Sequence, residues 1–338
     1  MFNSRVYIKD SLQISRREDC RKDRPFMAAL VEYAKLLILA LSLGFSGPEG
    51  GPRALIEAWT AGPAAEAPRP ALRPDFRLPE KATLCGEALD LKKRSVYERL
   101  ELEFLRAVNQ PAQVALWQRR AAVYFPFIEA KLKAAGLPDD LKYLAVAESD
   151  LRPEVISPAG ALGLWQFMPA TAVRFGLTVN NKIDQRRLPE TLMSAAEAYF
   201  KFLYGKFGNW ALTMAAYNSG ENRLSRAIAA QGVRDYYQLD LPRETERYVY
   251  RIAAIKVIME NAPQYGLAAE IPAGRYRPAK FSEKRINLKK AAAWAAIARQ
   301  YGCDYKELRL LNPHILQSPM SGSFTLRLPS QDVKNLAR

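Results

Sequence analysis

The sequence predicts a mainly α protein that ends in a small α/β segment. Apolar residues recur at helical spacing from about residue 95 to residue 262, and this stretch shows almost none of the alternation typical of strands. The C-terminal part differs, because it combines two short helical stretches with an Asn-Pro turn and the strand-like segment FTLRLP. No internal repeat is visible.

An export signal is predicted at the N-terminus. Residues 5–24 are rich in Lys and Arg, and an apolar run from Leu36 to Phe45 follows them. The run is shorter than the roughly 18 residues that a membrane span needs, so a signal peptide fits it better. We therefore expect residues 1–46 to be a polar leader and signal peptide. A translation start at Met27 would shorten the leader, and a core helix of the folded domain is the alternative interpretation.

A linker and a helical domain are predicted next. Residues 47–94 are assigned to a linker, because their first part is rich in Pro and Ala. The helical domain is expected over residues 95–270. Its first helices are expected in SVYERLELEFLRAV, in QVALWQRRAAVYFPFIEAKLKAAG up to Gly136, and after LPDD, whose proline and aspartates suit a helix N-terminus. Gly205 is expected to end a later helix. The later helices are expected at about 169–175, 189–204, 210–218, 221–230 and 242–260.

Glu148 stands on the apolar stripe of one predicted helix. Leu141, Leu144 and Ala145 recur at i, i+3 and i+4, and Glu148 is the next position on this stripe. Taking a carboxylate out of water raises its pKa, because the charged form loses solvation. A glutamate of this kind stays protonated near neutral pH and can act as a general acid.

Composition excludes several other classes of site. The chain has a single histidine, His314, and its cysteines Cys20, Cys85 and Cys303 lie far apart, which does not favour a metal site or a Ser/His/Asp triad. The net charge of +15 suits a polyanion or an anionic surface, such as a membrane surface. Nucleic acid is not favoured, since no zinc spacing, basic-region heptad or RNA-binding aromatic motif is present. His314 beside its proline is expected in a surface loop.

Four short motifs follow one another between residues 135 and 265. They are Glu148-Ser149 with Ser157 nine residues after the glutamate, GALGLWQFMP, AYNSG at 216–220, and ETERYV at 244–249. Together they resemble family 1 lytic murein transglycosylases, in particular the membrane-bound transglycosylase D type. The resemblance implies a goose-type lysozyme-like α-domain, in the periplasm or cell envelope.

The resemblance also implies roles for individual residues. Glu148 falls on the catalytic acid/base of the family. Trp165 departs from the Met or Ile that the family often has. It stands beside Gln166, where it is expected to alter the packing of the sugar but not the chemistry. The substrate-binding residues implied by the motifs are Ser157, Gln166, Met168, Tyr217, Glu244 and Tyr248. Several of these have a structural alternative: a turn for Ser157, a solvent-facing position for Gln166, core packing for Tyr217 and a first-turn helix acid for Glu244.

The implied reaction is cleavage of the MurNAc-GlcNAc β-1,4 bond of peptidoglycan strands, with formation of 1,6-anhydro-MurNAc ends and without a metal or other cofactor. Most glycosidases use a second carboxylate, and Asp150, Asp184 and Glu221 are not clear partners for Glu148. In the family the muramic acid's own C6 hydroxyl attacks instead. A hydrolytic goose-type lysozyme and a non-catalytic peptidoglycan-binding protein are the alternatives.

Residues 286–329 resemble a degenerate lysin-motif-like segment. The expected order is helix, helix, LNP, loop and the strand FTLRLP, without the usual opening strand and its GD turn. Lys289 and Lys290 stand where an opening turn would be. Two roles are predicted for this segment, glycan binding or structural support of the helical domain.

Overall fold

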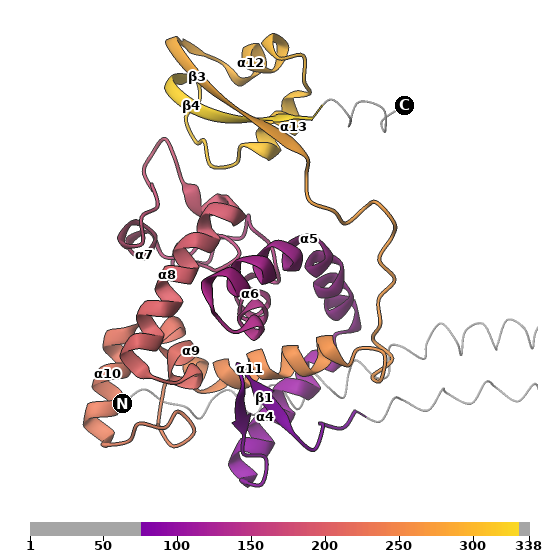
Figure 1. The fold of residues 1–338 in the computed structure, drawn as a ribbon, viewed down its shortest axis with the longest axis vertical. Coiled ribbons are helices and arrows are strands. Elements are labelled where there is room, and N and C mark those ends of the chain that lie inside the picture. Colours follow the sequence, from indigo (N-terminus) through magenta and orange to yellow (C-terminus); the bar gives the residue numbers. More distant parts are fainter. Residues whose placement is uncertain (1–75, 331–338) are drawn as a thin grey trace, which may run out of the picture. The chain divides into compact units, whose positions relative to one another are not determined.

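The mainly α fold class with a small C-terminal α/β segment is confirmed (Figure 1). The computed structural model describes residues 76–330, so the predicted leader, the signal peptide and most of the predicted linker lie outside the described residues. The helical body consists of α4 (Arg94–Val108), α5 (Pro111–Ala135), η1 (Asp139–Leu141), α6 (Lys142–Ser149), α7 (Pro169–Arg174), η2 (Gln185–Arg187), α8 (Pro189–Phe207), α9 (Trp210–Ser219), α10 (Glu221–Gln231) and α11 (Arg243–Glu260).

One helix end was placed wrongly. Helix α8 passes through Gly205 and continues to Phe207, where Gly208 follows with a φ of 78°. A left-handed residue after the last turn is the usual way for a helix to end, and glycine takes this conformation without strain. Gly205 lies inside the helix, where a glycine weakens but does not stop it.

The C-terminal boundary of the predicted linker is also wrong. A short antiparallel hairpin, β1 (Ala82–Leu84) and β2 (Glu87–Leu89), precedes the first helix and packs its apolar side chains into the main core. The Glu87 carboxylate accepts hydrogen bonds from the N–H groups of Trp210 and Ala211 at 2.7 and 3.3 Å. These N–H groups begin α9 and have no partner within the helix, so the hairpin caps α9.

Helix α6 is enclosed by the rest of the helical body (Figure 1). It packs against α11 and α5, and α11 also packs against α4 and α9. Such a helix must be apolar on most sides, and α6 meets this requirement except at Lys142, Glu148 and Ser149. The hydroxyl of Ser149 donates to the carbonyls of Ala145 and Leu164. The buried residues of α6 are Tyr143, Leu144, Ala145, Val146, Ala147 and Ser149.

The C-terminal segment has an opening strand that the sequence analysis missed. It contains β3 (Phe281–Ala292), α12 (Trp294–Gln300), α13 (Tyr305–Leu311) and β4 (Met320–Pro329). The two strands pair antiparallel, and the register is irregular between Leu288 and Ala292. Lys289 and Lys290 lie in this irregular part, which interrupts the alternation expected of a strand. The segment has its own small apolar core.

The C-terminal segment contacts the helical body through backbone atoms. The N–H of Asp184 donates to the carbonyl of His314, and the N–H of Leu316 donates to the carbonyl of Lys182, both at 2.8 Å. His314 is only 8% exposed, so its predicted place in a surface loop is wrong. Burial lowers the pKa of His314 to about 4, which leaves the ring neutral near pH 7.

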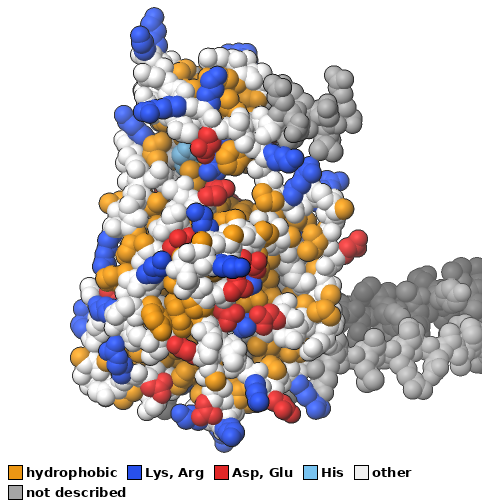
Figure 2. Space-filling model, viewed as in Figure 1, with side chains coloured by type: hydrophobic (Ala, Val, Ile, Leu, Met, Phe, Trp, Pro, Cys, Tyr) orange, Lys and Arg blue, Asp and Glu red, His pale blue; other side chains and the backbone are white. Residues whose placement is uncertain are grey.

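Charged side chains are spread over the surface. Figure 2 shows Lys and Arg scattered over the face in view, without one large basic patch of the kind that binds nucleic acid. Among the helices of residues 76–330, none combines the length and the apolar character that crossing a membrane requires.

Candidate active site

One cavity of about 460 Å³ brings together every residue that the sequence predicted for the site. It is lined from the end of α6, the loop that follows α6, the end of α9 and the N-terminal half of α11. These distant parts of the chain meet because α11 packs against both α6 and α9. The predicted residues that line the cavity are Glu148, Ser157, Gln166, Met168, Tyr217, Glu244 and Tyr248.

Glu148 lies on the last turn of α6 and faces the cavity. Leu144 and Ala145 on the same stripe are completely buried, so the carboxyl group emerges from an apolar surface. The Tyr248 hydroxyl, on α11, donates a hydrogen bond to Glu148 Oε1. This bond fixes the orientation of the carboxyl group and leaves its second oxygen available to a ligand in the cavity.

The pKa of Glu148 is set by opposing effects. Burial raises it from 4.5 to about 7, because the charged form loses its solvation. The hydrogen bond from Tyr248 and the positive charge of Arg251 lower the pKa, and the negative charge of Glu244 raises it. The effect of burial is the largest. A carboxyl group whose pKa lies near neutral pH can give up a proton and take one back during the same reaction.

Two left-handed residues end α6 directly after the site. Asp150 and Leu151 have φ angles of 54° and 57°, which are uncommon for residues other than glycine. Helix α5 holds this turn: Trp117 Nε1 donates to Asp150 Oδ1 at 2.8 Å, and Arg120 donates to the Asp150 carbonyl at 3.0 Å. Asp150 therefore has a structural role and, as expected, is not a partner for Glu148.

The loop between α6 and α7 forms one wall of the cavity and is held by its own side chains. Ser157 Oγ accepts a hydrogen bond from the N–H of Ala161 at 3.0 Å. Gln166 Nε2 donates to the carbonyls of Val155 and Gly163 at 2.9 and 3.0 Å. Ser157 thus makes the turn contact that was its structural alternative, and Gln166 points inward to backbone. Both side chains still line the cavity.

Tyr217 lies on the floor of the cavity. Its hydroxyl donates to the carbonyl of Trp165 at 2.6 Å, and its ring stacks on Phe200 with 5.3 Å between centroids. Burial raises the pKa of Tyr217 well above 10, so the phenol stays neutral. Trp165 is completely buried against Phe200 and does not line the cavity, so any effect on sugar packing would pass through its neighbours. Met168 is 41% exposed at the edge of the cavity.

A buried ion pair supports the same loop, and the sequence analysis missed it. Arg186 binds Asp184 through Nε and Nη2 at 3.0 and 2.8 Å, and its Nη1 donates to the carbonyls of Gly160 and Phe167, both at 2.8 Å. Gly163 packs so closely that a Cβ there would lie 2.3 Å from the Arg186 carbonyl oxygen. The loop is therefore fixed by a guanidinium group that never reaches the cavity.

The opposite wall contains charged residues that the motifs did not indicate. Glu103 on α4 is 5% exposed and accepts hydrogen bonds from Arg247 at 2.7 and 3.1 Å. Arg251 and Asn218 also line the cavity, and Asn218 Nδ2 lies 3.5 Å from Glu244 Oε1. Within residues 76–330, no three His, Cys, Asp or Glu side chains are grouped in a way that could hold a metal ion.

The match to known proteins agrees with this geometry. Residues 125–239 match the family described as "Transglycosylase SLT domain". The chain is 32% identical over 209 residues to membrane-bound lytic murein transglycosylase D of Escherichia coli K12. The matched region makes up 60% of this chain and 45% of the relative. It is 37% identical over 86 residues to the soluble lytic murein transglycosylase of the same organism, which covers 24% of this chain and 13% of the relative.

The solved structures found to be similar include the 70 kDa soluble lytic transglycosylase from Escherichia coli, with a TM-score of 0.38 and 23% identity over 51% of this chain and 32% of that chain. The family match and the sequence relatives confirm the resemblance to family 1 lytic transglycosylases, and residues 125–239 form a transglycosylase SLT domain. The chain spans less than half the length of the transglycosylase D relative.

Proposed function

We propose that this chain is a lytic transglycosylase that cleaves the β-1,4 bond between MurNAc and GlcNAc in peptidoglycan and leaves a 1,6-anhydro-MurNAc end. The observation that carries the proposal is Glu148, a carboxyl group of the matched SLT domain that has a pKa of about 7 and faces the cavity. The names of the sequence relatives, which are murein transglycosylases, support the substrate class.

Glu148 acts first as the acid. Its protonated carboxyl group gives a proton to the glycosidic oxygen, the bond from C1 of the muramic acid to this oxygen breaks, and the GlcNAc side leaves as an alcohol. The muramic acid C1 then carries positive charge. The carboxylate formed on Glu148 stabilises this charge at short range, because the surrounding residues exclude water and weaken screening.

Glu148 acts next as the base. It takes the proton from the C6 hydroxyl of the same muramic acid while the C6 oxygen forms a bond to C1, which closes the 1,6-anhydro ring and restores the acid. One carboxyl group is sufficient because the nucleophile belongs to the substrate. An internal hydroxyl in the right orientation competes well with water, since effective molarities of such reactions reach about 10⁵ M or more.

The other predicted residues hold the acid and the substrate. Tyr248 orients the Glu148 carboxyl group, and the neutral Tyr217 closes the floor beside it. Ser157 and Gln166 hold the loop between α6 and α7 in place. The donors and acceptors that these bonds leave free face the glycan. Met168 gives an apolar contact at the edge. Burial is the main cause of the raised pKa of Glu148, and the negative charge of Glu244 adds to it.

Analysis of the products tests this proposal. Murein digested with the purified protein should release fragments with anhydro ends, which mass spectrometry identifies by the loss of one water relative to hydrolytic products. Glu148→Gln is the matched control and should release neither. Reducing ends instead of anhydro ends would make the protein a muramidase, and the absence of products with the wild-type protein would make it a binding protein.

For the whole chain, we propose export to the periplasm or cell envelope and a catalytic domain that starts at the β1–β2 hairpin and reaches about residue 270. The positive charge also favours contact with an anionic membrane surface. For the C-terminal segment we propose structural support. Its backbone hydrogen bonds to Lys182 and Asp184, and the ion pair of Arg327 with Glu190 at 3.1 Å, support this role.

Deletion of residues 275–338 separates the two roles of the segment. Structural support predicts that the truncated protein becomes insoluble or sensitive to protease, because Ile183 and the loop around it lose their cover. Glycan anchoring predicts instead a folded protein that cleaves soluble fragments normally and pellets less with insoluble murein.

A further inference from the structure

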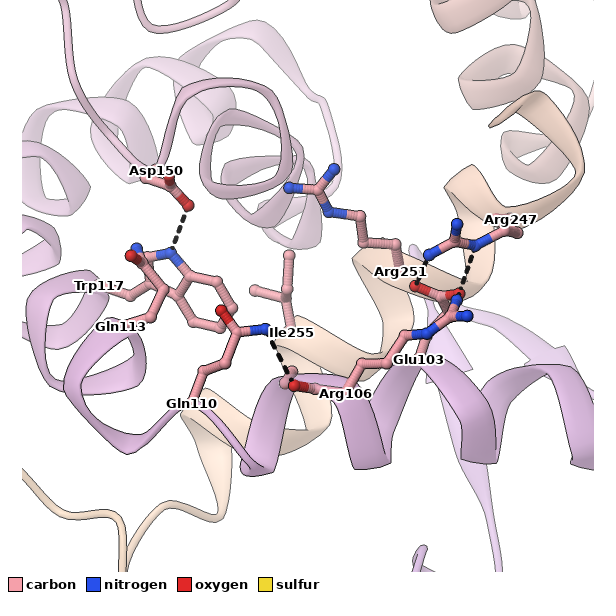
Figure 3. Close-up of a pocket in the computed structure, with 10 residues that line it drawn as sticks. Glu103, Arg106, Gln110, Gln113, Trp117, Asp150, Arg247, Arg251 and Ile255 are labelled. Atoms are coloured by element: carbon pink, nitrogen blue, oxygen red, sulfur yellow. Dashed lines mark hydrogen bonds and ion pairs between the residues drawn. The ribbon is translucent and has the colours of Figure 1, made fainter. Parts of the chain in front are cut away.

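A second hollow of about 280 Å³ adjoins the catalytic cavity along α11 (Figure 3). The two hollows share Glu103, Arg247 and Arg251, so they lie next to each other. The second hollow is closed by the end of α4, the start of α5 and the turn after α6. We call it the arginine pocket and define it by Arg106, Gln113, Trp117, Asp150, Arg251 and Ile255.

One arginine in this pocket lacks a hydrogen-bond or ion-pair partner among residues 76–330. Arg106 and Arg247 both bind Glu103, at 2.8 and 2.7 Å, so each of them has a carboxylate partner. Arg251 forms no hydrogen bond or ion pair with any residue of the described part of the chain. Figure 3 shows its guanidinium pointing away from Glu103, towards the side where Asp150 and Trp117 lie. The pocket therefore offers one guanidinium group whose N–H groups are free to donate, although its charge also acts on Glu148 and the carboxylate of Asp150 lines the same pocket.

A second donor lacks an acceptor. Gln113 lines the arginine pocket from the first turn of α5, and its Nε2 is buried without a hydrogen-bond partner within the described residues. Buried donors are nearly always paired, since an unpaired one costs free energy. The amide of Gln110 on the same wall differs, because it donates to the carbonyl of Arg106 at 3.1 Å. The unpaired donor of Gln113 thus points to an acceptor on a ligand.

We propose that the arginine pocket binds a carboxylate carried by the glycan strand, with Arg251 gripping the carboxylate and Gln113 donating to a carbonyl or carboxyl oxygen beside it. A guanidinium presents two parallel N–H groups that match a carboxylate. Ile255 and the edge of Trp117 supply apolar contact for the carbon chain that carries it. This inference rests on the proposed function, because it assigns a part of the same substrate.

Two parts of peptidoglycan can supply this carboxylate. Where a peptide is attached, the peptide carries it, and where the peptide has been removed, the lactyl group of the muramic acid carries it. The test therefore uses three soluble fragments of equal length: one with peptides, one without peptides, and a β-1,4-linked GlcNAc oligomer that has no carboxylate.

Binding is measured by calorimetry at pH 7 with the full chain carrying Glu148→Gln. This background stops turnover and removes the influence of Arg251 on the pKa of Glu148. For each carboxylate-bearing fragment, the readout is its affinity divided by the affinity for the carboxylate-free oligomer. We expect Arg251→Met to lower this ratio at least ~10-fold for one or both fragments, as for a lost hydrogen bond to a charged group.

Two further variants test the second donor and provide a control. Gln113→Leu keeps the size of the side chain and lies outside the catalytic cavity, and it should lower the same ratio about 3-fold, as for a lost neutral hydrogen bond. Arg106→Met is the matched control, because it removes an arginine of the same pocket whose charge is already paired; the ratio should change less than ~2-fold.

The outcomes separate this inference from the proposed function. A loss confined to the peptide-bearing fragment assigns the pocket to a peptide carboxylate, and a loss confined to the peptide-free fragment assigns it to the lactyl group. If the ratio is the same in Arg251→Met and Gln113→Leu as in their parent, the carboxylate site is wrong, even if the wild-type protein releases anhydro products. A wild-type protein that releases no product contradicts the proposed function itself.

Discussion

Glu103 and Glu148 line the same cavity, but their carboxyl groups have different kinds of hydrogen-bond partner. Glu103 on α4 lies between two guanidinium groups, those of Arg106 and Arg247, and is held as an ion pair. Glu148 on α6 accepts its hydrogen bond from the neutral hydroxyl of Tyr248. The difference between a charged and a neutral partner therefore separates a carboxylate that joins two helices from a carboxyl group that faces the cavity.

The two regions also differ in what they connect. The bonds of Glu103 join α4 to α11 and fix the helix that carries Tyr248. The bond of Glu148 joins α6 to α11 at the cavity itself. Changes at the two glutamates should therefore have different consequences, for stability in the first case and for turnover in the second.

The largest expected effect distinguishes the two carboxyl groups by activity. Glu148→Gln keeps the shape of the side chain but removes the proton, so the turnover of murein should fall by at least ~10²-fold, as for the loss of a general acid. Glu103→Gln should cost less than ~10-fold, because it alters only the support of α11. Release of soluble fragments from purified murein measures both. Equal losses in the two variants would contradict the division of roles.

The next effect concerns stability. Glu103→Ala removes hydrogen bonds from two arginines to a buried carboxylate, and we expect the free energy of unfolding to fall by about 1–3 kcal/mol. Glu98→Ala is the surface control, since its pair with Arg94 is exposed and should contribute much less than the buried pair. Urea denaturation at neutral pH measures both changes. A loss at Glu103 no larger than the loss at Glu98 would show that the buried pair is not an anchor.

The pH dependence tests the proton exchange at Glu148. The protonated form starts the reaction, so activity should fall about tenfold for each pH unit above the pKa of about 7. The folded protein also binds this proton more tightly than the unfolded chain, whose carboxyl pKa is near 4.5. The contribution of Glu148 to the free energy of unfolding should therefore decrease as pH rises from 4.5 to 7.

The control for this pH dependence is Glu148→Gln, whose stability should lack the decrease between these two pH values. Activity and denaturation profiles from pH 4 to 9 give both results. An activity that has already vanished by pH 5 on its alkaline side would mean that burial does not raise the pKa of Glu148.

The smallest expected effect comes from Tyr248→Phe. The hydroxyl of Tyr248 lowers the pKa of Glu148, so its removal should move the alkaline limit of activity to higher pH. The rate at the optimum should also decrease, because the carboxyl group loses its fixed orientation. Tyr236→Phe is a control, since its hydroxyl donates to backbone carbonyls of α11 and has no bond to Glu148. An alkaline limit that moves to lower pH would contradict the predicted direction.

The sequence was sufficient for features that depend on neighbouring residues. The stripe of Leu141, Leu144 and Ala145 placed Glu148 on a buried face, and the structure puts it there. The helices were found to within a few residues because their apolar spacing is regular. The motif residues were all assigned to one site, and one cavity contains them.

Features that depend on distant residues were not accessible. Glu103 and Arg247 are 144 residues apart, and Arg186 reaches the carbonyl of Gly160 across a loop without periodicity. The strands of the β1–β2 hairpin have three residues each, which is too short for a pattern. The end of β3 could not be recognised from the sequence. Lys289 and Lys290 lie where the pairing of the strand is irregular, so the alternation is lost there.

The backbone contact between the C-terminal segment and the helical body has a consequence for evolution. The hydrogen bonds of Asp184 with His314 and of Lys182 with Leu316 join N–H and carbonyl groups, which every amino acid except proline provides. Selection on this contact therefore acts on the path of two loops rather than on the identity of most side chains in them. Sequences on both sides can diverge while the contact persists, and related chains can keep the same arrangement after their similarity at these positions has disappeared.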